Sequence, residues 1–136
     1  MSQKLSEVLL VDDYEADNYL HRLAFETLGC AEQVSVAKNG EEALAHLARS
    51  TPELICLDIN MPVMDGWEFI QAFEALEPRP PSLLLVMLTT SSRAEDRQRA
   101  KAQPLVADYV EKPLTAEVLG QRLAQWFPGR FPALER

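Results

Sequence analysis

Short apolar runs alternate with longer segments of helical periodicity, and this alternation occurs five times along the chain. The apolar runs are Val8–Val11, Val34–Ala37, Leu54–Leu57, Leu83–Leu88 and Ala107–Val110. Continuous apolar runs of this length are typical of strands that are buried on both faces, as in a parallel sheet covered by helices. The pattern therefore predicts an α/β fold, a doubly wound sheet of five parallel strands with helices on both faces.

The segments between these runs carry apolar residues three or four positions apart, which predicts amphipathic helices. Gly29 is a typical C-terminal stop for the first helix, while Asn39 and Thr115 are typical starts for the second and fifth. The fourth helical segment, Ser92–Gln103, differs from the others because its only apolar residues are alanines. Alanine buries little surface, so we expect this element to be loosely held.

The length of 136 residues fits one domain, which we place at residues 1–127, followed by a C-terminal tail at residues 128–136. Phe131 lies in this tail between two prolines, where a single domain offers little to pack against it. An exposed aromatic residue favours a partner surface, so we expect a homodimer that uses the last helix and the tail as an oligomerisation arm. The alternative is a tail that folds back on its own domain.

A stiff exposed turn is expected at Pro78, Pro80 and Pro81.

Composition and charge exclude several classes of function. The chain has 13 Lys and Arg residues against 21 Asp and Glu residues, a net charge of −8, which argues against a nucleic-acid or anionic membrane surface. No apolar run approaches the roughly 20 residues that span a bilayer, and the N-terminus lacks a secretory signal pattern. Cys30 and Cys56 have no metal-ligand spacing, so we expect reduced thiols and a cytoplasmic location. His21 and His46 fall on predicted helices away from the strand ends, and we assign them no catalytic or ligand role.

Polar residues follow four of the predicted strands at the point where each strand ends. They are Asp12 and Asp13, Asp58, Thr89, and Lys112. Right-handed crossovers bring the carboxyl ends of parallel strands to one edge of a sheet, where ligands bind. Three carboxylates at that edge favour a hard cation such as Mg²⁺, while a lysine and a hydroxyl suit the oxygens of a phosphoryl group. The pattern predicts a phosphoryl site in which Asp58, at the end of the central strand, is the nucleophile.

Four pieces of the chain, taken in this order and spacing, resemble the receiver domain of two-component response regulators. They are Val8–Asp13, Leu57–Gly66, Leu88–Ser91 and Tyr109–Pro113. The resemblance extends from about Leu5 to Phe127. It implies a flavodoxin-like fold with the strand order 2-1-3-4-5. Among such proteins, the chain is similar to small stand-alone regulators that pair with phytochrome-type histidine kinases.

The resemblance also implies roles for the acidic residues and their neighbours. Asp58 would be the phosphoacceptor. Asp13 and Asp58 would bind Mg²⁺ through their carboxylates, Asn60 through its backbone carbonyl, and Asp12 mainly through a bound water.

Further roles follow from the resemblance for residues near the ends of the last two strands. Thr89 and Lys112 would hold the phosphoryl oxygens, and Tyr109 would be an aromatic switch that turns inward when Thr89 moves. A cis peptide bond before Pro113 would aim Lys112, and Gly66 would permit the tight turn into the third helix.

The function implied is a stand-alone receiver that accepts a phosphoryl group on Asp58 from a sensor histidine kinase and signals by binding another protein. Its chemistry would be limited to its own phosphorylation and slow dephosphorylation, so it is not expected to be an enzyme in the usual sense. One alternative is a Mg²⁺-dependent phosphatase or phosphotransferase with an aspartyl-phosphate intermediate. Such enzymes commonly carry a second carboxylate two residues after the nucleophile, where this chain has Asn60. The other alternative is a degenerate receiver that acts as a constitutive binding module, against which the intact polar set argues.

Overall fold

The computed structural model describes residues 3–76 and 83–134, and these residues contain a single parallel sheet. Its strands are β1 (Val8–Val11), β2 (Val34–Ala37), β3 (Leu54–Leu57), β4 (Leu84–Thr89) and β5 (Val106–Glu111). Their order is β2-β1-β3-β4-β5, with every pair parallel, which confirms the predicted fold class and strand order. The turn expected at Pro78, Pro80 and Pro81 lies outside the described residues.

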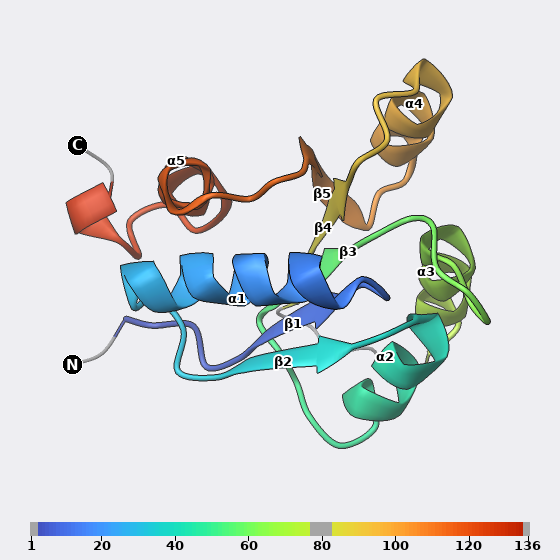
Figure 1. Ribbon diagram of the computed structural model, residues 1–136, viewed down its shortest axis with the longest axis horizontal. Coiled ribbons are helices and arrows are strands. Elements are labelled where there is room, and N and C mark those ends of the chain that lie inside the picture. The colour runs from blue at the N-terminus through green and yellow to red at the C-terminus, as the bar shows by residue number, and fades with distance from the viewer. Residues whose placement is uncertain (1–2, 77–82, 135–136) are drawn as a thin grey trace.

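Five α-helices cover the two faces of the sheet within these described ranges (Figure 1). On one face lie α1 (Glu15–Leu28) and α5 (Ala116–Trp126), and on the other lie α2 (Gly40–Leu47), α3 (Gly66–Glu74) and α4 (Ala94–Ala102). None of the helices in residues 3–76 and 83–134 is long and apolar enough to cross a membrane.

The expected helix ends are present. Gly29 closes α1 in the left-handed conformation, with φ of 59°. The side chain of Asn39 accepts a hydrogen bond from the backbone of Glu42 at the start of α2, and that of Thr115 does the same for Val118 at the start of α5. These caps satisfy backbone N–H groups that the first turn of a helix leaves without partners.

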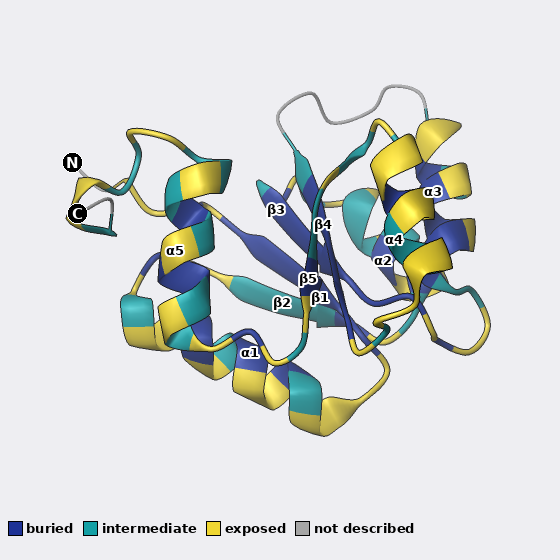
Figure 2. Cartoon of the chain, turned by 90° about the horizontal axis from the view of Figure 1, so that it is seen from above, coloured by how far each residue is buried: buried dark blue, intermediate teal, exposed yellow. Residues whose placement is uncertain are grey.

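The two central strands, β1 and β3, are buried along their whole length, as Figure 2 shows. Alternate side chains point to opposite faces of the sheet, so each strand contributes to two cores. One core lies under α2 and α3 and includes Leu9 and Leu57, and the other lies under α1 and α5 and includes Leu10 and Cys56. Each large apolar side chain buried in this way stabilises the fold by roughly 1.5–3 kcal/mol. The central strands are therefore firmly held, and so is the position of the residues at their carboxyl ends.

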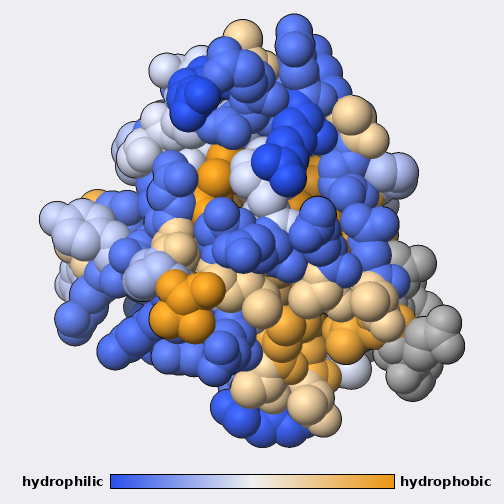
Figure 3. Space-filling view, turned by 90° about the vertical axis from the view of Figure 1, so that its right-hand side faces the viewer, coloured by the Kyte–Doolittle hydropathy of each residue, from blue (hydrophilic) through white to orange (hydrophobic). Residues whose placement is uncertain are grey.

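Helix α4 has little part in these cores. Ala100 is the one residue of α4 that is buried. Hydrophilic side chains predominate in the upper part of Figure 3, where α4 lies, whereas apolar side chains gather in the lower part of that view. Two arginines attach it to its neighbours. The guanidinium of Arg99 lies 4.4 Å from the centre of the Trp67 ring on α3, and that of Arg97 lies 4.8 Å from the centre of the Tyr109 ring on β5. The small apolar contribution expected of this segment is confirmed.

The tail folds back on its own domain as far as residue 134, where the described residues end. Phe131 is half-buried, and its ring meets that of Phe127 edge-on, with 6.4 Å between the ring centres. Leu134, in a short 3₁₀ turn (η1, Pro132–Leu134), packs against the core under α1 and α5. This arrangement follows the alternative of a tail packed on its own domain, whereas the homodimer stays a prediction.

Candidate functional site

Backbone hydrogen bonds fix two carboxylates at the ends of the central strands. The backbone N–H of Asp12 donates to the carbonyl of Ala37 at 3.0 Å, and that of Asp58 donates to the carbonyl of Val11 at 2.9 Å. Both aspartates are thus held as continuations of β1 and β3. Their side chains are buried, although Asp13 beside them is exposed. The structure therefore brings the three predicted carboxylates together, and one oxygen from each lies within 4.8 Å of the others.

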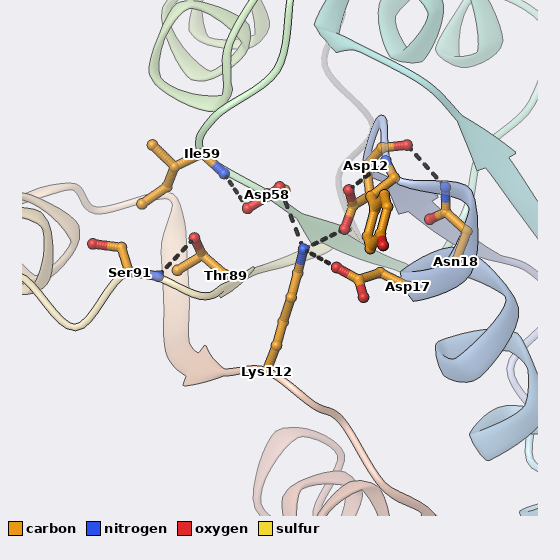
Figure 4. A network of polar contacts seen from close by, with 9 residues as sticks. Asp12, Asp17, Asn18, Asp58, Ile59, Thr89, Ser91 and Lys112 are labelled. Atoms are coloured by element: carbon orange, nitrogen blue, oxygen red, sulfur yellow. Dashed lines mark hydrogen bonds and ion pairs between the residues drawn. The ribbon is translucent and has the colours of Figure 1, made fainter.

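Lys112 reaches this acidic site from the end of β5 (Figure 4). Its backbone N–H donates to the carbonyl of Thr89 at 2.9 Å, and the peptide bond between Lys112 and Pro113 is cis, as the resemblance implied. The ammonium Nζ donates to Asp12 at 2.5 Å and to Asp17 at 2.8 Å, and it lies 3.4 Å from Asp58. A nearly buried lysine is thereby surrounded by carboxylates.

Burial and charge shift the pKa values of the groups in this site. Burial of the Asp58 carboxyl raises its pKa, and the charge of Asp12 adds to this, while Lys112 and a hydrogen bond from Thr89 act in the opposite direction. Burial alone would lower the pKa of Lys112, but its hydrogen bonds to Asp12 and Asp17 and the charge of Asp58 raise it. Lys112 is therefore a permanent cation. Asp58 becomes a more basic carboxylate, which makes it a better nucleophile when ionised.

Thr89 and Tyr109 are linked through one residue of the loop that follows β4. Thr89 is fully buried, and its hydroxyl oxygen accepts a hydrogen bond from the backbone of Ser91 at 3.2 Å. The hydroxyl of Tyr109 donates to the backbone carbonyl of the same Ser91 at 2.8 Å. The half-buried Tyr109 ring lies under Arg97 of α4. The inward turn of Tyr109 stays a prediction, but the described contacts join the phosphoryl site to α4 through a short chain of residues.

The loop between β3 and α3 brings backbone close to Asp58. Asn60, two residues after Asp58, is exposed, and its role as a metal ligand stays a prediction. A Cβ atom on Gly66 would lie 2.4 Å from the backbone carbonyl oxygen of Asp58. Gly66 is thus required for the close approach of backbone in the turn that leads into α3. The left-handed residue of this loop is Val63, with φ of 68°, an unfavourable conformation for a β-branched side chain.

Helix α1 contributes three residues that the sequence analysis missed or misplaced. Asp17 binds Lys112, and the side-chain amide of Asn18 donates to the backbone carbonyl of Asp12 at 2.8 Å. His21 is only 2% exposed, and burial followed by the positive charge of Lys112 lowers its pKa. Our placement of His21 away from the strand ends was wrong, because α1 starts two residues after Asp13 and brings His21 within range of the charges of Lys112, Asp17 and Asp12. The four-residue spacing of Asp13, Asp17 and His21 is the signal that could have found Asp17 and His21, whereas no such spacing marks Asn18.

His46 lies elsewhere, as expected. Its Nε2 is 2.7 Å from the buried carboxylate of Glu7, which precedes β1 and therefore lies at the opposite end of the sheet from Asp12 and Asp58. Ser35 also donates to Glu7, at 2.6 Å. These contacts attach α2 to the sheet and are remote from the phosphoryl site.

The donor set suits a hard divalent cation. Three carboxylates whose oxygens lie within 4.8 Å of one another repel, and oxygen ligands from Asp12, Asp13 and Asp58 match the preference of Mg²⁺. The exposure of Asp13 leaves one side of the cluster open to solvent, which suits an ion that keeps several waters. The residues present therefore fit a magnesium ion.

Comparison with known proteins agrees with this geometry. The model of the family described as "Response regulator receiver domain" matches residues 8–124, which is most of the chain. The chain belongs to the receiver domain family of response regulators. A relative in Leptolyngbya boryana, described as an uncharacterized 14.6 kDa protein, is 38% identical over 126 residues, which cover 93% of this receiver and 92% of the relative.

Solved structures show the same architecture. A two-component response regulator from Cytophaga hutchinsonii superimposes with a TM-score of 0.82 at 31% identity, covering 90% of this receiver and 96% of that chain. The bacteriophytochrome response regulator RtBRR superimposes with a TM-score of 0.77 at 27% identity, covering 97% of this receiver and 90% of that chain. The predicted family resemblance is thereby confirmed, including its similarity to regulators of the phytochrome type.

Proposed function

We propose that this receiver accepts a phosphoryl group on Asp58 from a phosphohistidine of a sensor histidine kinase, in a reaction that requires Mg²⁺. The observation that carries the proposal is the position of Lys112. Its ammonium lies 3.4 Å from Asp58, inside a cluster of carboxylates at the carboxyl edge of the sheet. A buried cation beside a carboxylate of raised pKa suits the capture of an anionic phosphoryl group.

In the transfer step, an oxygen of Asp58 attacks the phosphorus atom, and the bond from phosphorus to the histidine nitrogen breaks. The electron pair of that bond stays on the leaving imidazole. The Lys112 ammonium and the Thr89 hydroxyl then donate to the peripheral oxygens of the phosphoryl group, where negative charge is carried.

A bound Mg²⁺ would supply further charge neutralisation at the phosphoryl oxygens. It would be held by the carboxylates of Asp13 and Asp58, by the backbone carbonyl of Asn60, and by Asp12 mainly through a bound water. Dephosphorylation returns the site to its starting state when water attacks phosphorus and the bond to the Asp58 oxygen breaks. The products are the Asp58 carboxylate and inorganic phosphate, which takes the protons of the water. Since this chemistry acts on the receiver itself, we do not class the protein as an enzyme.

The signal would leave the site through Thr89. When its hydroxyl turns toward the phosphoryl group, it gives up the hydrogen bond that it accepts from Ser91. The carbonyl of Ser91 holds the Tyr109 hydroxyl, so movement of this loop frees Tyr109 to turn inward. Arg97 lies over the Tyr109 ring, and α4 would move with it.

The proposal extends to partners and location. The Leptolyngbya relative is matched over 92% of its length, which supports a single-domain regulator that signals by binding another protein. The likeness to RtBRR supports a kinase of the phytochrome type. Cys30 and Cys56 are buried free thiols, in keeping with a cytoplasmic location.

A homodimer through α5 and the tail is tested by truncation after Pro128. Sedimentation with an unchanged oligomeric state would remove the support for the homodimer.

Intact mass measured after incubation with Mg²⁺ and acetyl phosphate tests the phosphoacceptor. The expected result is a gain of one phosphoryl group, which is absent in Asp58→Asn and absent when the metal is chelated. Asp108→Asn is the matched control, because Asp108 pairs with Arg122 and Trp126 instead of Lys112, and it should gain the group normally.

Other outcomes identify the rival functions. Continuous turnover of added phosphoesters would favour a phosphatase or phosphotransferase. A chain that gains no phosphoryl group, even from its kinase, would be a constitutive binding module.

A further inference from the structure

The Lys112 ammonium contacts more carboxylates than the proposed phosphoryl transfer requires. Its ammonium has three N–H donors, and three carboxylates surround it. The contacts to Asp12 and Asp17 are 2.5 Å and 2.8 Å, whereas the contact to Asp58 is 3.4 Å. Figure 4 shows the lysine between Asp58 on one side and the two aspartates near α1 on the other. The ammonium is therefore drawn away from the residue that it would serve.

Asp17 differs from the other two carboxylates in its place in the fold. It lies in the first turn of α1, and its oxygens do not belong to the cluster formed by Asp12, Asp13 and Asp58. Its side chain is 23% exposed, against 7% for Lys112, so solvent reaches the carboxylate but hardly reaches the ammonium. Asp17 can thus rehydrate at little cost if Lys112 leaves it.

A phosphoryl group on Asp58 would bring new oxygen acceptors to Lys112. The donor that faces Asp58 at 3.4 Å can pass to one phosphoryl oxygen, but the ammonium can move closer to the group, or reach a second oxygen, only if it releases Asp12 or Asp17. Asp12 is a buried member of the acidic cluster, while Asp17 is the partner that is most open to water. The contact between Lys112 and Asp17 is therefore the one that is released at the lowest cost.

We propose that Asp17 is a positioning residue that holds the Lys112 ammonium on the α1 side of the site and opposes phosphorylation of Asp58. The inference rests on the proposed function. It adds that α1, through Asp17, restrains the Lys112 ammonium from moving toward Asp58. Asp17 also places a negative charge near the incoming phosphoryl group. Removal of that charge lowers the repulsion felt by an anionic donor and frees Lys112 to move toward Asp58.

The test compares Asp17→Asn, Asp17→Glu and Glu15→Gln with the unaltered chain, with acetyl phosphate as donor. Asp17→Asn should be phosphorylated about threefold or more faster, whereas Asp17→Glu, which keeps the charge, should stay within about twofold of the unaltered chain. Glu15→Gln is the matched control because it removes the same charge from an exposed position in the same turn of α1, and its rate should not change. An equal or slower rate for Asp17→Asn, or an equal gain for Glu15→Gln, overturns the proposal.

A second measurement reads the contact without phosphorylation. In ¹H–¹⁵N spectra of lysine side chains, the Lys112 ammonium should give a signal protected from exchange with water, assigned by its loss in Lys112→Met. The signal should weaken through faster exchange in Asp17→Asn but not in Glu15→Gln. An unchanged signal overturns the inference whatever the rates. If the unaltered chain gains no phosphoryl group from acetyl phosphate or from its kinase while the ammonium signal responds as expected, the proposed function fails and the contact between Asp17 and Lys112 stands.

Discussion

Helices α4 and α5 precede and follow the same edge strand, β5, yet different forces hold them. Leu119 and Leu123 of α5 are fully buried, and the aromatic residues after them pack on the same core. In α4, Ala100 alone is buried, and arginine side chains make its contacts with α3 and β5. Apolar burial of two leucines is worth several kcal/mol, whereas exposed cation–π contacts are worth about 0.5–1 kcal/mol each.

This difference separates a fixed part of the receiver from a part that can respond. A helix held by weak contacts can shift when a single hydrogen bond in the loop after β4 changes, because little free energy opposes the shift. A helix held by buried leucines cannot move without opening the core. The path from Thr89 through Ser91 to Tyr109 ends at the weakly held helix.

The largest effect is expected from Leu123→Ala in α5. Loss of a fully buried leucine leaves a cavity, so the free energy of unfolding should fall by about 3 kcal/mol, as measured by urea denaturation. Leu20→Ala is the control, since Leu20 on α1 is 49% exposed and its loss should cost less than about 1 kcal/mol. Equal losses in the two variants would contradict the firm attachment of α5.

The next effect is a difference in amide hydrogen exchange between the two helices. Amides of α4 should exchange about 100-fold faster than the central amides of α5, because α4 can open locally while α5 opens with the whole core. Mass spectrometry of peptides from the two segments, or NMR, measures the ratio. Exchange in α4 as slow as in strand β3 would show that α4 is not loosely held.

The weak burial of α4 and the positions of the residues at the strand ends could both be predicted from the sequence. Both follow from local patterns: an all-alanine set of apolar positions in one case, and a polar residue directly after an apolar run in the other. Parallel strands have their carboxyl ends at the same edge of a sheet, so the topology brings Asp12, Asp58 and Lys112 to one edge. No knowledge of helix orientation is needed for these inferences.

The residues that we missed are brought to their places by tertiary structure. The face that α1 turns toward the sheet places some of them, and the path of the tail places the others. Asp17 and His21 reach the site only because of the direction in which α1 crosses the sheet. Glu53 and Arg130 are 77 positions apart, and no local pattern links them. Their pairing is a result of tertiary packing, which the local patterns of a single sequence do not reveal.

Glu53→Gln tests the attachment of the segment that follows α5. Arg130 in the tail binds both oxygens of Glu53, at 2.6 Å and 2.9 Å, so the change should lower the free energy of unfolding at pH 7 by about 1 kcal/mol. The same pairing with Arg130 lowers the pKa of Glu53, and a carboxyl of lowered pKa stabilises the fold above its unfolded pKa and loses this effect as pH falls.

The difference in the free energy of unfolding between the unaltered chain and Glu53→Gln should therefore have its full size near neutral pH. It should shrink below the ordinary glutamate pKa of about 4.3. Denaturation at several pH values measures it. Glu32→Gln, at an exposed position, is the control for the change of charge and should show no such difference. A difference that persists unchanged to pH 3 would mean that the ion pair is not its source.

The smallest effect is expected from Arg99→Ala in α4. The Arg99 guanidinium lies over the face of Trp67, and its loss should lower the free energy of unfolding by only about 0.5 kcal/mol, near the limit of denaturation measurements. Because this contact joins α4 to α3, its loss should accelerate exchange in α4 by about two- to threefold while α5 is unaffected. Arg93→Ala is the matched control, since Arg93 pairs with the exposed Glu95 of its own segment, and exchange should stay as in the unaltered chain. If Arg99→Ala and Arg93→Ala changed exchange equally, the stacking on Trp67 would not be what holds α4, and its attachment would rest on Ala100 and on the contact of Arg97 with Tyr109.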